Sequence, residues 1–310
     1  MRKAVIHELT ELARADERLV LLTGDLGFMV IEEFADTHPK RFINMGVAEA
    51  NMLGVAAGLA LEGFRPYCYS IATFASLRPF EQLRNGAHLH QLRVRVIAVG
   101  GGFGYGTAGI THHAVEDVAV MRTLPHMRVI APADDRDAAL AVRMLHDEPG
   151  PTYFRLAKDA RVLEALPGTF DTTRLQVIGD GEILLLALGT IADEAVHAQE
   201  LLAARDIHVR VAIATCLAPT PATHLVALLS EASSVVTLED HVLPGGLGSQ
   251  VAEVIAENGL GCRLQRLGIE ETHYSTLGSE AFLRRRAGLD AESVAARLAT
   301  QVLRQYLRAS

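Results

Sequence analysis

At 310 residues, the chain is long enough for two ordinary domains, and 49% of its residues are apolar, which is enough for two cores. The net charge of -8 and the dispersed Lys and Arg residues argue against a nucleic-acid binder, which needs a basic face. No apolar run reaches the roughly 20 residues that span a membrane. The N-terminal residues lack the apolar stretch of a signal peptide, and three widely separated cysteines fit a reducing compartment. We therefore expect a cytoplasmic protein without nucleic-acid or membrane partners.

Short apolar runs alternate with helical patterns through the first half of the chain. The spacing predicts a first helix around residues 5–13 and a buried strand at Leu19–Leu22, which is apolar on both faces. An Ala- and Gly-rich helix is expected at residues 46–63, a strand and loop at 65–74, and a helix at 78–92. A strand at 92–102 leads into a glycine-rich loop at 102–113. A helix from near Ala114, a strand at 127–134 and a helix at 134–147 follow.

The alternation restarts after a polar, irregular stretch at residues 158–176. Strand–helix alternation on both sides predicts an α/β protein with two doubly wound domains, each with a largely parallel sheet. We place the domains at residues 1–165 and 176–310.

Glu49 lies in the opening turn of an otherwise apolar helix, near Val47, Met52 and Leu53. A carboxylate in such surroundings should be buried, which favours its protonated form, and perturbed carboxylates concentrate at functional sites. The alternative is a Glu that only complements the positive end of the helix.

The glycine-rich loop ends in two adjacent histidines, His112 and His113. Glycines after a strand permit a close approach of the backbone to a ligand, and His112 is suited to act as a general acid or a substrate contact. The alternative is a packing or helix-capping histidine. The loop is not a dinucleotide fingerprint, because the helix begins too late.

Two further glycine motifs precede regular elements. The run 179–181 (Gly-Asp-Gly) resembles the start of a metal–diphosphate motif, but no Asn follows at a usable spacing, so we interpret it as a turn. The run 244–250 (PGGLGSQ) opens a helix, where free amides would hold an anion. Its glycines would equally allow tight packing at a domain contact, which we favour.

Five segments together resemble the C-terminal two-thirds of transketolases. They appear in that family's order at residues 21–27, 42–63, 73–80, 106–134 and 239–249 (LLTGDLG, FINMGVAEANMLGVAAGLALEG, TF…F, GTAGITHHAVEDVAVMRTLPHMRVIAPAD and EDHVLPGGLGS). The resemblance implies a thiamine-diphosphate pyrimidine-binding domain followed by a transketolase C-terminal domain. The combination is specific, whereas each segment alone is weak.

The resemblance gives Glu49 a definite role. The corresponding Glu hydrogen-bonds the aminopyrimidine ring of thiamine diphosphate and promotes loss of the thiazolium C2 proton, in the dry setting inferred above. Phe74 and Phe80 match aromatic positions that pack on this ring, and Leu77 replaces a third. The remaining expected cofactor contacts are Asp25, Leu26 and Val47.

The resemblance also suggests substrate contacts at His112, His113 and Arg155. Arg155 matches an arginine that holds a sugar phosphate, and the alternative is a surface ion pair. However, Gly100, Ala108 and Met29 stand where donor-contacting polar residues are expected, which leaves the usual ketose-phosphate donor open.

The segments that match leave out the diphosphate-binding domain of a full transketolase. We therefore expect a partner subunit that carries the diphosphate and Mg²⁺ site, in an α2β2 assembly that transfers a two-carbon ketol unit from a ketose to an aldose-like acceptor. One alternative is the β subunit of a 2-oxo-acid dehydrogenase. Another is a non-catalytic scaffold that kept the fold.

Overall fold

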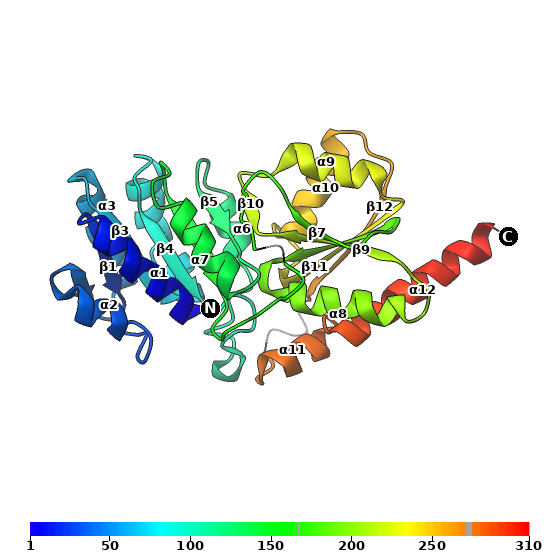
Figure 1. Ribbon diagram of the computed structural model, residues 1–310, viewed down its shortest axis with the longest axis horizontal. Helices are drawn as coiled ribbons and strands as arrows, with labels where there is room; N and C mark the ends of the chain where they lie inside the picture. Colours follow the sequence, from blue (N-terminus) through cyan, green and yellow to red (C-terminus); the bar gives the residue numbers. More distant parts are fainter. Residues whose placement is uncertain (167, 271–274, 310) are drawn as a thin grey trace.

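The computed structural model describes residues 1–166, 168–270 and 275–309 of the chain, with side chains up to residue 300. Within these ranges the strands form two sheets that lie side by side, and helices cover both faces of each (Figure 1). The expected α/β architecture with two largely parallel sheets is thus confirmed.

The first sheet has seven strands in the order β10-β5-β6-β4-β3-β1-β2, all parallel except β10, which runs antiparallel to β5. Its strands are apolar on both faces, so alternate residues enter two different cores, as in other parallel sheets. On one face lie α1 and α7; on the other lie α3, α4, a π-helix and α6. The bounds are β1 (Leu19–Thr23), β2 (Phe42–Asn44), β3 (Arg65–Ile71), β4 (Arg95–Val99), β5 (Arg128–Ile130), β6 (Thr152–Leu156), β10 (Cys216–Ala218), α1 (Arg2–Ala15), α2 (Glu32–Thr37), η1 (Pro39–Arg41), α3 (Glu49–Leu61), α4 (Ala72–Leu77), α5 (Phe80–Gln82), the π-helix η2 (Leu83–His88), η3 (Gly106–Ala108), α6 (Asp117–Arg122) and α7 (Asp135–Met144).

The second sheet has five strands in the order β12-β11-β8-β9-β7, and only β7 is antiparallel to its neighbour. Helices α8, α11 and α12 pack on one face, and α9 and α10 on the other. The bounds are β7 (Gln176–Ile178), β8 (Ile183–Leu188), β9 (Val209–Ala214), β11 (Ser234–Val242), β12 (Arg263–Ile269), η4 (Gly189–Ile191), α8 (Ala192–Ala203), α9 (Ala222–Glu231), α10 (Leu247–Glu257), α11 (Glu280–Ala287) and α12 (Ala291–Ala309).

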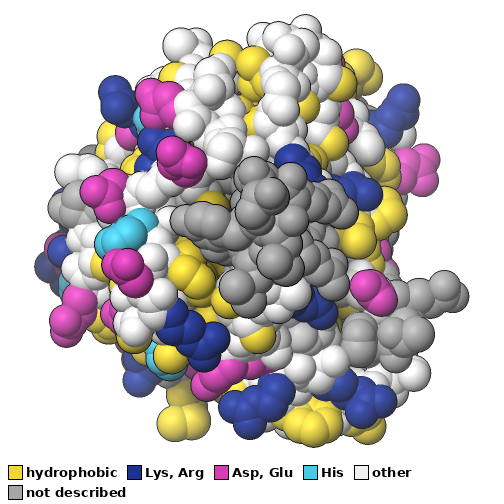
Figure 2. Space-filling model, turned by 90° about the vertical axis from the view of Figure 1, so that its right-hand side faces the viewer, with side chains coloured by type: hydrophobic (Ala, Val, Ile, Leu, Met, Phe, Trp, Pro, Cys, Tyr) yellow, Lys and Arg dark blue, Asp and Glu magenta, His cyan; other side chains and the backbone are white. Residues whose placement is uncertain are grey.

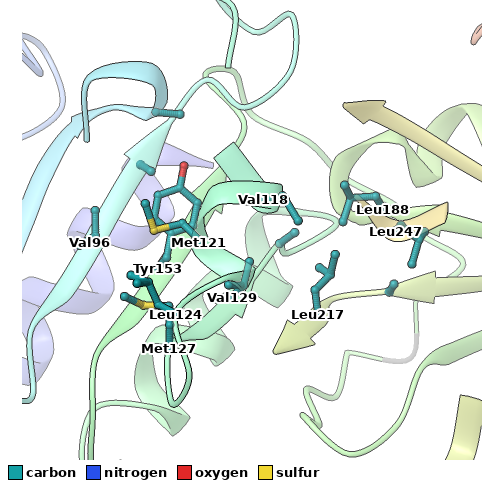
Figure 3. Close-up of a cluster of buried hydrophobic side chains, with 14 of the residues drawn as sticks. Val96, Val118, Met121, Leu124, Met127, Val129, Tyr153, Leu188, Leu217 and Leu247 are labelled. Carbon is teal, nitrogen blue, oxygen red and sulfur yellow. The ribbon is translucent and has the colours of Figure 1, made fainter. Parts of the chain in front are cut away.

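One hydrophobic core extends across both sheets. Side chains from the first sheet and α6, such as Val96, Val118 and Val129, belong to the same buried cluster as Leu188 and Leu247 of the second half (Figure 3). Strand β10 also crosses over, because it follows β9 in the chain yet pairs with β5. The connecting stretch 158–176 holds no helix or strand before β7 among its described residues (residue 167 lies outside them).

Several local elements differ from the sequence-based expectation. The residues after β3 form helix α4 where a loop was expected, and the helix expected from Ala114 begins only at Asp117. Ala114 instead exchanges backbone hydrogen bonds with Gly102, at 2.7 and 3.0 Å. The helix expected at residues 78–92 is a short α-turn followed by the π-helix.

A buried ionic cluster also joins the two halves. Arg155 on β6 donates from Nε to Asp117 on α6 at 3.0 Å and from Nη1 to Asp240 on β11 at 2.8 Å. The other oxygen of Asp240 accepts from Arg284 on α11 at 3.0 Å. The two arginines hold the pKa of Asp240 well below its usual range, although burial opposes this. The cluster therefore fixes the first sheet against the second through charges that water cannot screen.

No helix among the described residues is both long and apolar enough to cross a membrane. On the face around the C-terminal helix, acidic and basic side chains are interspersed and form no large patch of one sign (Figure 2).

Replacing Arg155 with Met should lower the free energy of unfolding by about 3–5 kcal/mol, because Asp117 and Asp240 would stay buried without their shared partner. Urea denaturation measures this difference. Arg14→Met is a matched control, since Arg14 forms an exposed ion pair with Glu11 at 3.4 Å and should cost less than about 1 kcal/mol. Equal effects of the two variants would contradict the interpretation of the cluster.

Candidate functional site

Four loops of the first sheet meet at one edge. Strands β1, β2, β3 and β4 are neighbouring and parallel, so the segments that follow them leave the sheet on the same side. The expected residues Asp25, Glu49, Phe74 and His112 each come from a different one of these segments. Ligand sites of open α/β sheets lie at this carboxyl edge. The fold thus collects residues that are far apart in the sequence.

Glu49 is the centre of this edge. Its side chain is only 2% exposed, as the apolar helix predicted. Oε1 accepts a hydrogen bond from Ser70 at 3.1 Å, and Oε2 accepts one from Arg78 at 2.9 Å. Ser70 is itself fully buried at the end of β3. One carboxylate oxygen is therefore held by a buried hydroxyl, while the other is paired with Arg78, whose side chain is 45% exposed.

Neither Ser70 nor Arg78 was predicted. Both follow Arg65, in the same stretch as the predicted aromatic residues Phe74 and Phe80. Arg78 comes four residues after Phe74, and on a helix this spacing would place the two side chains on one face. Helix α4 was not expected, so this spacing had no structural meaning in the sequence alone.

Two rings lie beside Arg78, the partner of Glu49. Phe74 lies edge-on against His112 with centroids 5.0 Å apart, and the guanidinium of Arg78 lies 3.8 Å above the Phe74 ring. Burial lowers the pKa of His112, and the positive charge of Arg78 lowers it further. A neutral imidazole is the form that can accept a proton near pH 7. Phe80 is half-buried against the core, and Leu77 is 44% exposed at the rim.

The remaining expected cofactor contacts lie at the rim. Asp25 is exposed, adopts a positive φ of 58° and accepts a hydrogen bond from Asn44 at 2.8 Å. Leu26 is half-buried, and its carbonyl accepts from the Thr23 hydroxyl at 2.9 Å. Val47 is 73% exposed, so it does not help to bury Glu49 as the sequence suggested. All three remain candidates for contact with a ligand.

His113, the second histidine of the pair, is buried, and its expected role as a substrate contact stays a prediction. It is 2% exposed and lies edge-on against Phe103 with centroids 5.2 Å apart. The two adjacent histidines therefore differ in burial: His112 is half-buried beside Phe74, whereas His113 is buried and its Nδ1 atom has no hydrogen-bond partner among the described residues.

Arg155 does not fit the phosphate-binding role that the sequence suggested, nor is it a surface ion pair. It is 3% exposed, and its guanidinium is fully engaged by Asp117, Asp240 and the Ala114 carbonyl. Lys158, two residues beyond β6, was not among the predicted residues: it is half-buried, and its ammonium lies 5.1 Å over the Tyr105 ring. The Tyr105 ring lies 6.2 Å from the His112 ring, so Tyr105 lies between Lys158 and the candidate site.

The loop glycines serve packing. Gly100 has a φ of 82°, and a Cβ there would lie 2.2 Å from the Tyr105 ring. A Cβ at Gly102 would lie 2.5 Å from the Asp240 carboxylate. The residue at 100 is thus glycine because Tyr105 fills the adjacent volume, and no side chain such as a donor-contacting His fits there.

The two other glycine motifs have internal roles. Residues 179–181 form the turn between β7 and β8, as expected. At the start of α10, the amides of Leu247 and Gly248 donate to the Glu239 carboxylate at 2.7 and 2.9 Å. The helix terminus is therefore capped by the protein's own carboxylate. Arg122 of α6 also donates to the Gly245 carbonyl, which supports the domain-contact interpretation.

Glu239 should make the stability of the protein depend on pH. Burial raises its pKa to about 7, although the two backbone donors oppose the shift. The folded state then binds more protons than the unfolded chain between about pH 4.5 and 7, so the free energy of unfolding should fall as pH rises through this window. Chemical denaturation of wild type and Glu239→Gln across the window measures this difference. A constant difference between the two proteins would contradict it.

Two family models cover most of the chain. The transketolase pyrimidine-binding domain matches residues 1–161, and the transketolase C-terminal domain matches residues 175–294.

Similar proteins and structures agree with these matches. The "putative transketolase C-terminal section" of Methanocaldococcus jannaschii is 36% identical, over 98% of this chain and 97% of that one. One subunit of an apulose-4-phosphate transketolase from Phocaeicola vulgatus is 31% identical, over 94% of each chain. A solved structure titled "split gene transketolase, inactive beta4 tetramer" has a TM-score of 0.85 and 34% identity, covering 96% of this chain and 97% of that one. A 1-deoxy-D-xylulose-5-phosphate synthase of Syntrophotalea carbinolica is 34% identical, but the match spans only 46% of it.

Proposed function

Because the chain belongs to the transketolase family, we propose that it is the cofactor-activating subunit of a split, thiamine-diphosphate-dependent transketolase. The observation that carries this proposal is Glu49: a buried carboxylate with one oxygen bonded to Ser70 and the other to Arg78, whose guanidinium lies over the Phe74 ring. Relatives that the chain covers almost completely are named as a C-terminal section of a transketolase and as one subunit of a transketolase.

The residues present fit the pyrimidine end of thiamine diphosphate. Glu49 Oε2 would accept a hydrogen bond from the ring, while Ser70 keeps the carboxyl group from rotating. Phe74 offers an aromatic face, with Leu77, Leu26 and Val47 as apolar rim. The hydroxyl oxygen of Thr73, beside Phe74, is buried and has no hydrogen-bond partner within the described residues, as expected where a ligand completes a site. When bound, the cofactor would supply the nucleophilic carbon that carries a two-carbon ketol unit.

The chain's own residues would control proton positions in this site. Glu49 would hold a proton between its Oε2 atom and the cofactor ring, which requires the water-excluded setting described above. His112 would exchange a proton with a hydroxyl of the substrate, since its lowered pKa keeps the ring neutral. Its Nδ1 atom lies 2.9 Å from the Thr111 hydroxyl, which orients the ring.

We assign the diphosphate and Mg²⁺ to a partner subunit with the N-terminal type of transketolase domain. In this arrangement the cofactor lies between two chains, and an α2β2 assembly provides two such sites. The exposed rim of the candidate site, including Phe28, Met29 and Val47, would then be covered by the partner.

Isothermal titration with thiamine diphosphate and Mg²⁺ tests the shared site. We expect tight binding only when this chain is mixed with a diphosphate-domain subunit, and sedimentation of the mixture should give the α2β2 mass. Tight binding by this chain alone would contradict the proposal.

Glu49→Gln should reduce ketol transfer by the assembled enzyme at least 100-fold, because an amide cannot hold the proton that the reaction requires. The melting temperature of this variant should stay close to that of the wild type. Ketol transfer and lipoamide acylation are assayed in parallel, since acylation without ketol transfer would point to a 2-oxo-acid dehydrogenase. An unaffected activity would favour a scaffold role.

Lys158 is proposed as the contact for an anionic substrate group, in place of Arg155. Lys158→Met should raise KM for a phosphorylated ketose about 10-fold and leave KM for its unphosphorylated counterpart nearly unchanged, because a lost ion pair affects only the charged substrate. Parallel steady-state assays of both substrates measure this contrast. Equal changes would contradict the assignment.

A further inference from the structure

Arg78 contacts both Glu49 and Phe74 in the candidate site. It follows α4 directly, with Pro79 next in the chain, and its planar guanidinium makes two contacts: Nη1 lies 2.9 Å from Glu49 Oε2, and Cζ lies 3.8 Å above the centre of the Phe74 ring. Within the described residues, its guanidinium makes no other hydrogen bond.

These two contacts are the ones that a pyrimidine ring would need. The ring requires a hydrogen bond to the Glu49 oxygen that Ser70 leaves free, and it requires the aromatic face of Phe74. A guanidinium is flat, donates N–H groups in its own plane and stacks on aromatic rings, so it satisfies both requirements at once. The ring and the guanidinium cannot occupy the same space.

From this overlap we propose that Arg78 is a placeholder for the aminopyrimidine ring of the cofactor and must swing out before thiamine diphosphate binds. This inference rests on the proposed function and extends it, because it assigns a competitor for the site to the chain itself. Arg78 acts on the reaction through Glu49 and the cofactor seat, so it is a positioning residue.

The charge and exposure of the two side chains explain why a placeholder is useful. The Glu49 side chain is 2% exposed, and a buried carboxylate without a partner is costly. Arg78 supplies that partner while the site lacks its ring. The Arg78 side chain is itself 45% exposed at the end of a short helix, so it can reach solvent by side-chain rotation alone.

Displacement has a predictable direction. When an uncharged ring replaces Arg78, Glu49 exchanges an ion pair for a hydrogen bond, and Phe74 exchanges one stacking partner for another. Removing the Arg78 side chain should therefore lower the stability of the free subunit but raise its affinity for the cofactor in the complex. A side chain with a purely structural role would move both quantities in the same direction.

The test measures both quantities with the full-length chain. Thiamine diphosphate and Mg²⁺ are titrated into the complex with the diphosphate-domain subunit, and thermal unfolding is recorded for this chain alone. Arg78→Met should bind the cofactor about 10-fold more tightly while the free chain melts at a lower temperature. Arg78→Lys keeps the charge but loses the flat stack, and it should fall between wild type and Arg78→Met.

Arg84→Met is the matched control, because Arg84 is an exposed arginine on the nearby π-helix η2 and bonds only to the adjacent Asn85 among the described residues. It should change neither quantity. If Arg78→Met does not assemble, Arg78→Gln should give a smaller gain of the same sign.

The outcomes separate the two proposals. Equal or weaker cofactor binding by the Arg78 variants, with normal binding by wild type, would overturn the placeholder alone. Absence of binding by every complex, including Arg84→Met and wild type, would overturn the proposed function and the placeholder with it.

Discussion

The structure depends on a carboxylate held between two buried guanidinium groups. Asp240 accepts hydrogen bonds from Arg155 of the first sheet and from Arg284, which packs on the second. The same Arg155 binds Asp117 at the start of α6, and Asp117 also accepts from the Tyr153 hydroxyl at 2.8 Å. Each ion would be costly alone, and together they compensate one another. The position of one sheet against the other is thereby tied to the position of α6.

This cluster also determines the path of the loop that carries His112. Ala114 pairs its backbone with Gly102, and its carbonyl accepts from Arg155 at 3.2 Å. Gly102 must be small because the Asp240 carboxylate lies beside it. The loop therefore returns to the sheet at a fixed point, with His113 buried and His112 half-buried. The geometry of the candidate site at the sheet edge is thus set partly by buried ion pairs between the two sheets.

The sequence was informative where a residue's surroundings follow from its neighbours in the chain. The buried strands, the parallel sheets and the burial of Glu49 were predicted because apolar periodicity and helix position are local signals. Arg155 was misplaced because its partners lie 38 and 85 residues away. A lone arginine after an apolar run looks the same whether it faces a substrate or a buried aspartate.

Arg78 and Tyr105 were missed for a related reason. Arg78 reaches Glu49, 29 residues earlier in the chain, only because the unexpected helix α4 turns it back toward the site. The Tyr105 ring occupies the space that a side chain at position 100 would need. Because the two residues are five apart in an irregular loop, no periodic pattern in the sequence indicates this contact. The contacts that form the candidate site join residues that no local sequence pattern connects, whereas the helices and strands of the fold follow from local patterns.

Strand β10 has a consequence for how the chain is made. It completes the edge of the first sheet beside β5, yet it is synthesised only after β7, β8 and β9 of the second sheet. Because β5 ends at Ile130 and β10 begins at Cys216, the β5 edge stays open during synthesis for about 85 residues of further translation, and open strand edges pair readily with other chains. The N-terminal half cut at the linker would keep that open edge permanently. We therefore expect the two halves to behave as one cooperative folding unit rather than as separable modules.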